Sequence, residues 1–279
     1  MTENSVKPGE YAELHRPVYN PDLLITALDR SADRPALHLG DVVLTGAEMR
    51  AAISRYQQAL ASVGVGQGSS VAVLSKNRPE VLINMGATMI AGCRNSALNP
   101  MGSLDDHLYI TADAEIETLV FDPVHFEERA AELKAQVPTL KNLFSLGPSK
   151  IATDILALAD TFTEQRLVAA HVDAEDTSSM VYTGGTTGKP KGVMGSFRSG
   201  VALPQIQMSE WQWPDQPRFL ICTPLSTRVP HSSFPRCCAA LPLRVALLRT
   251  GTRPRGDREA PHRRHDARPD DDLHAARPP

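Results

Sequence analysis

The chain has 279 residues, of which 42% are hydrophobic and 22% charged, and its formal net charge at pH 7 is -3. This balance is typical of a globular protein with one large domain or two modest ones, and the near-neutral charge argues against a dedicated nucleic-acid binder. Residues 1–11 lack the apolar run of a signal peptide, no segment approaches the ~18 consecutive apolar residues of a membrane span, and the cysteines show no disulfide or metal-ligand spacing. We therefore expect a soluble, cytoplasmic protein.

Residues 20–146 alternate between helical and extended patterns. Apolar spacing and end signals predict helices over residues 22–32, 46–63, 79–90 and 123–136, and another that begins after Ser103. At the second helix, Thr45 and Glu48 have the spacing of a capping box. Strands are predicted at 36–39 and 42–44, joined as a hairpin, and at 71–74, 118–121 and 142–146. Strands separated by helices indicate βαβ units, so the expected fold class is α/β, with a mainly parallel β-sheet covered by helices.

A loop rich in glycine, threonine and lysine, residues 184–192, follows an apolar strand at residues 178–183. Glycines let backbone amides approach an anion, threonine hydroxyls donate hydrogen bonds and lysine supplies a positive charge, so the composition suits polyphosphate binding. The loop is not a Walker loop, because Lys189 is followed by Pro190. The alternative is a glycine-rich surface turn, which the ordered succession of these residues after a strand disfavours.

Residues 182–193, Tyr-Thr-Gly-Gly-Thr-Thr-Gly-Lys-Pro-Lys-Gly-Val, resemble the phosphate-loop signature of the adenylate-forming enzymes. Gly184 departs from that pattern, which usually has serine there, and the loss of one hydroxyl should weaken the phosphate cradle without abolishing it. The resemblance covers roughly residues 20–226 and is strongest to bacterial fatty-acid–CoA ligases. It also includes these upstream matches in the family's usual order: 34–37, 44–48, 64–66, 71–74, Asn77, Pro79, Glu80, Gly92 and 98–100.

The resemblance implies the N-terminal part of the large adenylate-forming domain and an ATP-dependent, AMP-forming acid–CoA ligase. The carboxylic acid substrate, which the resemblance implies is a fatty acid, would attack the α-phosphate of Mg²⁺-bound ATP. CoA would then displace AMP from the acyl-adenylate. The loop would hold the β- and γ-phosphates and stabilise the departing pyrophosphate. Lys191 would be the phosphate-facing, catalytic cation, whereas Lys189 occupies a variable position and is expected to be solvated. The implied nucleotide-binding residues are Thr183, Gly184, Gly185, Thr186, Thr187, Gly188 and Lys191.

Five other side chains are weaker candidates for functional roles. His107 and His125 lie on helical stretches and are expected to be surface or partly buried histidines. Trp211 and Trp213 could line an acyl pocket, although aromatic residues at this spacing are more often packing residues. Cys222 ends an apolar run, so we expect a buried strand cysteine that behaves as a small hydrophobe.

The composition changes abruptly after Ser226. Residues 1–226 contain 11 Arg and 7 Lys, whereas residues 227–279 contain 11 Arg, no Lys and 8 of the 22 prolines. The interpretation is an N-terminal extension (1–19), a partial AMP-binding domain (20–226) and a disordered Arg/Pro-rich tail outside the family pattern (227–279). Metal binding by the tail's histidines and nucleic-acid binding by its arginines are disfavoured, since acids interleave the arginines and no ligand spacing occurs.

A change of reading frame accounts for the tail better than a binding role does. Back-translation with GC-rich codons and a frame change at Ser226 gives His-Ala-Gly-Ala-Ala-Phe-Phe-Phe-Pro-Thr-Leu, which resembles the expected family segment. A different offset after Asp257 gives a second family-like stretch, so more than one insertion or deletion is implied. The polypeptide as written is then expected to be inactive. The alternatives are an adenylating enzyme with a non-CoA acceptor and a non-enzymatic nucleotide- or partner-binding module.

Overall fold

The computed structural model describes residues 16–183, 189–212, 218–221, 223–225 and 244–247. The helices of this part are α1 (Asn20–Arg30), α2 (Gly46–Ser62), α3 (Pro79–Ile90), α4 (Leu104–Asp113), α5 (Pro123–Gln136), α6 (Ile155–Ala159) and α7 (Phe197–Glu210). The strands are β1 (Pro35–Leu39), β2 (Val42–Thr45), β3 (Ser70–Leu74), β4 (Arg94–Ala97), β5 (Thr118–Phe121), β6 (Asn142–Ser145), β7 (Thr153–Asp154), β8 (Thr177–Thr183), β9 (Lys191–Ser196), β10 (Arg218–Ile221) and β11 (Arg244–Leu247).

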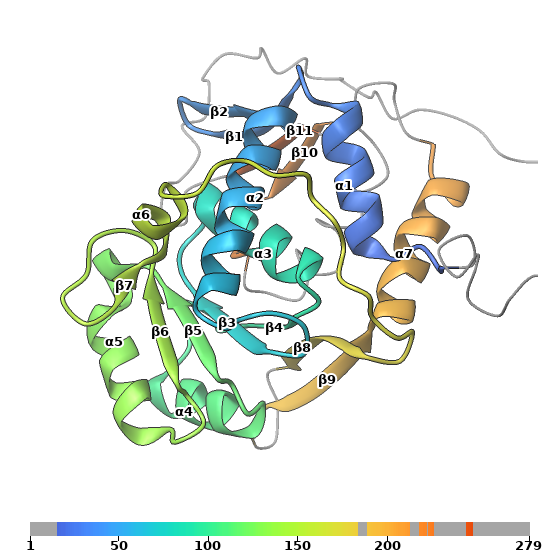
Figure 1. The fold of residues 1–279 in the computed structure, drawn as a ribbon. Helices are drawn as coiled ribbons and strands as arrows, with labels where there is room; N and C mark the ends of the chain where they lie inside the picture. Colours follow the sequence, from blue (N-terminus) through green and yellow to red (C-terminus); the bar gives the residue numbers. More distant parts are fainter. Residues whose placement is uncertain (1–15, 184–188, 213–217, 222, 226–243, 248–279) are drawn as a thin grey trace, which may run out of the picture.

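A seven-stranded sheet in the order β7-β6-β5-β3-β4-β8-β9 forms the centre of the molecule (Figure 1). Its strand pairs are parallel except for β8 and β9, which form an antiparallel edge. The expected mainly parallel α/β sheet is therefore confirmed. Because parallel strands end at the same edge, the segments that follow β3, β4, β5 and β8 leave from one side of the sheet.

Successive side chains of β3 point to opposite faces of this sheet, and each face carries its own part of the hydrophobic core. Val71 and Val73 pack with residues of α2, α3 and α6, whereas Ala72 and Leu74 pack with residues of α4 and α5. The whole strand is buried, as a central parallel strand covered on both faces requires. Helices thus cover both faces of the sheet, and α2 and α3 lie in front of it in Figure 1.

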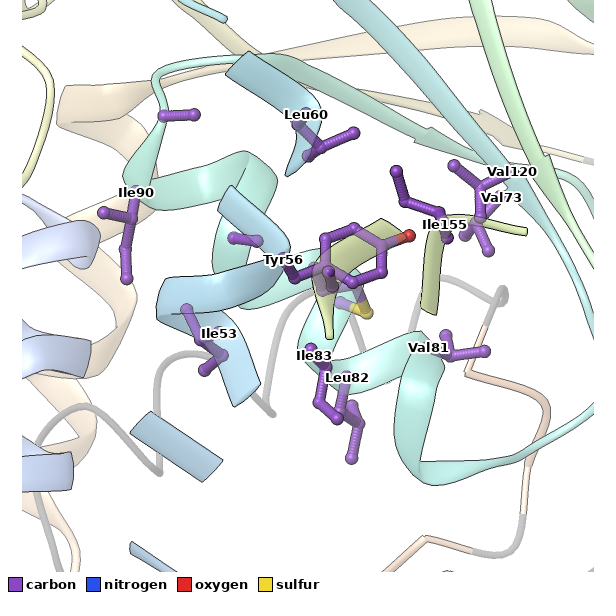
Figure 2. Packing of buried hydrophobic residues seen from close by; sticks show 14 of the residues in the cluster. Ile53, Tyr56, Leu60, Val73, Val81, Leu82, Ile83, Ile90, Val120 and Ile155 are labelled. Carbon is purple, nitrogen blue, oxygen red and sulfur yellow. The ribbon is translucent and has the colours of Figure 1, made fainter. Parts of the chain in front are cut away.

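Tyr56 is the largest fully buried side chain of the α2–α3 interface and projects from α2 into the core (Figure 2). It follows Ile53 and precedes Leu60 on the same helical face, in agreement with the three- and four-residue spacing of the sequence. Its hydroxyl donates to Asn84 Oδ1 at 3.1 Å, which provides the partner that a buried polar group needs. Burial raises the pKa of Tyr56 above its ordinary value, so the phenol stays neutral.

The capping box predicted from Thr45 and Glu48 is present at the start of α2. The Glu48 amide donates to Thr45 Oγ1 at 3.2 Å, and the Thr45 amide donates to Glu48 Oε2 at 2.7 Å. Ser103 and Asp106 form the same reciprocal pair at the start of α4. These bonds supply partners for backbone amides that a helix N-terminus leaves free.

A second sheet has the order β10-β11-β1-β2 and joins distant parts of the chain. β1 and β2 form the expected antiparallel hairpin, and β11 runs parallel to β1 on one side and to β10 on the other. Arg244–Leu247 is thus a strand, although the composition of residues 227–279 indicated a tail without regular structure. The average over the tail conceals the short apolar run Val-Ala-Leu-Leu at 245–248, which suits a strand. The other tail residues lie outside the described ones.

Candidate functional site: the β8–β9 hairpin

The candidate phosphate-binding segment connects the two strands of the β8–β9 hairpin. Thr183 ends β8 and is paired with Lys191, which begins β9. The Thr183 hydroxyl donates to the Lys191 carbonyl at 3.4 Å, so the two predicted site residues lie opposite each other where the strands end. The remaining predicted site residues, Gly184, Gly185, Thr186, Thr187 and Gly188, lie outside the described residues.

The two lysines of the segment lie in different surroundings. Lys191 is exposed, and its ammonium group forms no ion pair with the residues that the structure describes. Lys189 is exposed, as expected, and its Nζ lies 5.1 Å from the ring centroid of Tyr109 on α4. That geometry is a cation–π contact, which the sequence did not predict. Among the described residues, the Lys189 ammonium group thus has a partner on α4, whereas the Lys191 ammonium group has no ion-pair partner.

Helix α4 holds the strand that leads into the segment. The Tyr182 hydroxyl donates to Asp113 Oδ2 at 2.5 Å, and the Tyr109 hydroxyl lies 3.4 Å from Asp113 Oδ1. The two tyrosine rings meet edge to face, with centroids 6.5 Å apart and an interplanar angle of 88°. Burial, and then the hydrogen bond and charge of Asp113, raise the pKa of Tyr182. Sequence reasoning missed Asp113 and Tyr109, because no local pattern links them to residue 182.

Gly192 leaves room for the ring of Tyr182. The two residues are paired across the hairpin, and a Cβ added at Gly192 would lie 3.1 Å from Tyr182 Cζ and 3.1 Å from Met180 Cε. A side chain at this position would require Tyr182 or Met180 to shift by a few tenths of an ångström. The glycine that follows Lys191 in the motif therefore also has a packing role.

Polar groups at the ends of β3 and β5 form a second network. Asn77 donates to the Thr223 carbonyl at 2.9 Å and accepts from the Leu225 amide at 2.8 Å, which ties the segment after β10 to the loop after β3. Arg78 lies 3.4 Å from Asp122, which follows β5. In open α/β sheets ligands bind at this edge, so the network lies on the side where a substrate would enter.

The two histidines occupy different environments. His107 is buried, which corrects the expectation of a surface or partly buried residue; its neighbours Asn99 and Arg129 supply the partners that allow this. Arginine is a donor only, so Nδ1 of His107 accepts from Arg129, and its Nε2–H donates to the Asn99 carbonyl at 2.8 Å. Burial lowers the pKa of His107. His125 is partly exposed and lies 2.7 Å from Asp122.

The described part of the structure gives no support for a functional role of the remaining candidates, Trp211, Trp213 and Cys222. Trp211 is 52% exposed at the end of α7, and Trp213 and Cys222 lie outside the described residues. The strand before Cys222 is only partly buried, because Leu220 is exposed and Ile221 is buried. The expected burial of Cys222 itself stays a prediction, because that residue lies outside the described ones.

Neither a membrane span nor a metal cluster is found where the chain is described. None of its helices there is long and apolar enough to cross a membrane. No group of three or more His, Cys, Asp or Glu side chains could hold a metal ion within the same residues. A hollow of about 830 Å³ lies at the amino ends of the strands, lined by Ser70, Arg94 and Lys141 among others. It lacks the hairpin residues Thr183 and Lys191, so it is distinct from the candidate site.

Comparisons with known proteins show to which enzyme family the chain belongs. The family model described as AMP-binding enzyme matches residues 25–260, which extends past the change of composition after Ser226. The chain therefore belongs to the AMP-binding enzyme family, and its fold and hairpin motif agree with that membership. It is 46% identical over 219 residues to a medium/long-chain-fatty-acid–CoA ligase of Mycobacterium tuberculosis, covering 76% of this chain and 38% of that ligase.

Solved structures share the same architecture. An amide bond synthetase from Marinactinospora thermotolerans superposes with a TM-score of 0.72 at 27% identity, over 83% of this chain and 44% of that one. ATP-bound MatB from Rhodopseudomonas palustris gives a TM-score of 0.69 at 23% identity, over 81% and 45% of the two chains. The present chain thus spans less than half the length of each of these relatives.

Proposed function

We propose that the β8–β9 hairpin binds the β- and γ-phosphates of ATP with Mg²⁺, and that the chain is the N-terminal part of an ATP-dependent acid–CoA ligase. The observation that carries the proposal is the pairing of Thr183 with Lys191 where the two strands end. The Lys191 ammonium group, which forms no ion pair with the described residues, matches the charge of a polyphosphate, and the Thr183 hydroxyl beside it could turn from the Lys191 carbonyl to donate to a phosphate oxygen. Mg²⁺ would enter with the nucleotide, since magnesium is usually bound through substrate phosphates and few protein carboxylates.

The proposed reaction begins with attack of a carboxylate oxygen on the α-phosphorus of ATP. The bond between the α-phosphorus and the bridging oxygen breaks, which yields acyl-adenylate and pyrophosphate. Lys191 would stabilise the negative charge that grows on the pyrophosphate. A thiol of CoA then attacks the acyl carbon and releases AMP. The 46% identity to a medium/long-chain-fatty-acid–CoA ligase supports a fatty acid as the carboxylate substrate.

Nucleotide binding tests the role of Lys191 directly. Lys191→Ala should weaken the binding of Mg-ATP and of inorganic pyrophosphate by about tenfold or more, as measured by isothermal titration calorimetry. Lys150→Ala is the matched control, because Lys150 is an exposed lysine outside the hairpin. Equal affinity in the wild type, Lys191→Ala and Lys150→Ala would remove Lys191 from the site.

A second candidate function keeps the adenylation step and changes the acceptor. Its support is the likeness to an amide bond synthetase at 27% identity and a TM-score of 0.72. In that case an amine would take the acyl group in place of CoA. The acceptor would be decided by a product assay on a chain of the relatives' full length, with CoA and amines offered in competition.

A further inference from the structure

Three side chains attach the hairpin to α4. Asp113 ends α4 and receives the Tyr182 hydroxyl at 2.5 Å, and Tyr109, one turn earlier, has its hydroxyl 3.4 Å from the same carboxylate. Lys189 lies over the ring of Tyr109. Both strands of the hairpin are thus tied to one helix, β8 through Tyr182 and the approach to β9 through Lys189.

We propose that Asp113 is a positioning residue for nucleotide binding, which holds Thr183 and Lys191 in place through Tyr182. This inference rests on the proposed function of the hairpin. Tyr182 directly precedes Thr183, and its cross-strand partner Gly192 directly follows Lys191. A tyrosine fixed on α4 therefore fixes the neighbours of both proposed phosphate ligands.

The chemistry of the Asp113 contact suits this role. A hydrogen bond from a phenol to a carboxylate is charge-assisted and stronger than a bond between neutral groups. It joins residues 69 positions apart, so it restrains the hairpin relative to the helix layer and not only locally. Side chains that are already ordered lose less conformational entropy when a ligand binds. Asp113 would thereby increase affinity without contacting the nucleotide.

Lys189, which precedes β9, makes a second contact between the hairpin and α4. Its ammonium group lies over Tyr109 while Lys191 remains free of ion pairs with the described residues. The two cations are then kept apart, with one bound to α4 and the other available to phosphate. Lys189 therefore contributes through its contact with Tyr109 on α4 and not through a contact with phosphate.

Hydrogen exchange and ligand binding together test the proposal. We would compare the 279-residue wild type with Asp113→Ala, Asp113→Asn and Asp105→Ala, where Asp105 is an exposed carboxylate on the same helix. Amide exchange of peptides covering β8 and β9 would be followed by mass spectrometry, and binding of Mg-ATP and pyrophosphate by calorimetry. Asp113→Ala should accelerate exchange in β8 and β9 and weaken binding by roughly threefold to tenfold, which is less than the effect of removing Lys191 itself. Asp113→Asn, which keeps an acceptor oxygen, should restore part of both, and Asp105→Ala should change neither.

The two readouts separate failure of this inference from failure of the proposed function. Unchanged exchange of β8 and β9 in Asp113→Ala would overturn the positioning role, whatever the nucleotide does. Faster exchange that extends equally to β3 and β5 would also overturn it, because the contact would then stabilise the whole domain. If exchange rises only in the hairpin while wild type and Lys191→Ala bind nucleotide equally, the proposed phosphate site fails and Asp113 is only a hairpin anchor.

Discussion

Gly86 of α3 packs directly against the side chain of Ile53 on α2. A methyl group added there would lie 2.8 Å from Ile53 Cδ1, whereas carbon atoms in contact normally lie about 3.5–4.0 Å apart. Overpacking of this kind costs about 1–3 kcal/mol. Alanine is favoured over glycine in a helix interior by about 0.8–1.0 kcal/mol, which offsets part of the cost. We therefore expect Gly86→Ala to lower the free energy of unfolding by about 0–2 kcal/mol.

Shortening the facing side chain should reverse that effect. Ile53→Val removes one buried methyl group and should cost about 0.5–1.5 kcal/mol by itself. The nearest atoms to the added methyl group would then be Ile53 Cγ1 at 3.3 Å and Leu24 Cδ2 at 3.4 Å. In the Ile53→Val background, Gly86→Ala becomes neutral or stabilising. The double variant should therefore be more stable than the sum of the single effects by about 1–2 kcal/mol.

Urea denaturation followed by circular dichroism would measure this coupling across the four proteins of the cycle. Gly66→Ala is the matched control, because a Cβ added at Gly66 meets nothing within 4 Å. It should add to Ile53→Val without coupling. If the effects of Gly86→Ala and Ile53→Val on the free energy of unfolding add within about 0.3–0.5 kcal/mol, the close contact between residues 86 and 53 does not destabilise Gly86→Ala.

Four further outcomes are expected. Tyr56→Phe should lower the free energy of unfolding by about 1–2 kcal/mol in urea titrations, because it leaves Asn84 Oδ1 buried without a donor; an unchanged value would contradict the described bond. Burial, and secondarily Arg129, lower the pKa of His107 from the ordinary 6.5, so unfolding takes up a proton below that pH and stability should fall as pH drops below 6.5. An imidazole NMR titration should place His107 below 6.5, and a midpoint at or above it would refute the assignment. The 279-residue polypeptide alone should show no acid-dependent ATP–pyrophosphate exchange, since it spans 38% of the ligase it resembles; detectable exchange would contradict this. Nucleotide sequencing from the Ser226 codon should find an alternate frame that stays open and encodes further family motifs, and its absence would mean that residues 227–279 are the true continuation.

Strong local patterns account for the parts of the fold that the sequence predicted. The buried apolar run at β3, the box at the start of α2 and the proline at the start of α3 each depend on residues within a few positions of one another. The phosphate-loop motif is equally local, which is why Thr183 and Lys191 could be proposed as site residues from the sequence, and their role stays a prediction. Their pairing across a hairpin was not predicted, because it depends on the register of β8 and β9.

Elements that tertiary contacts stabilise were missed. β4 has the polar sequence Arg-Asn-Ser-Ala and is a strand because β3 and β8 pair with it on both sides. Helix α7 contains Pro204 in its interior, which is a local signal against a helix. The contact between Asp113 and Tyr182 joins positions that no periodicity relates. Contacts of this kind become visible only when the sheet order is known.

The order of strands in the second sheet has a consequence for folding. The seven-stranded sheet is made from the continuous stretch 70–196, so most of its pairings can form as soon as that stretch is available. β1 instead pairs with β11 through Leu37 and Val245, which lie at opposite ends of the described chain. Closing such a long loop carries a larger entropic cost and is slow. During synthesis one edge of β1 therefore remains unpaired until β11 has emerged, and an open strand edge is a template for pairing with other chains.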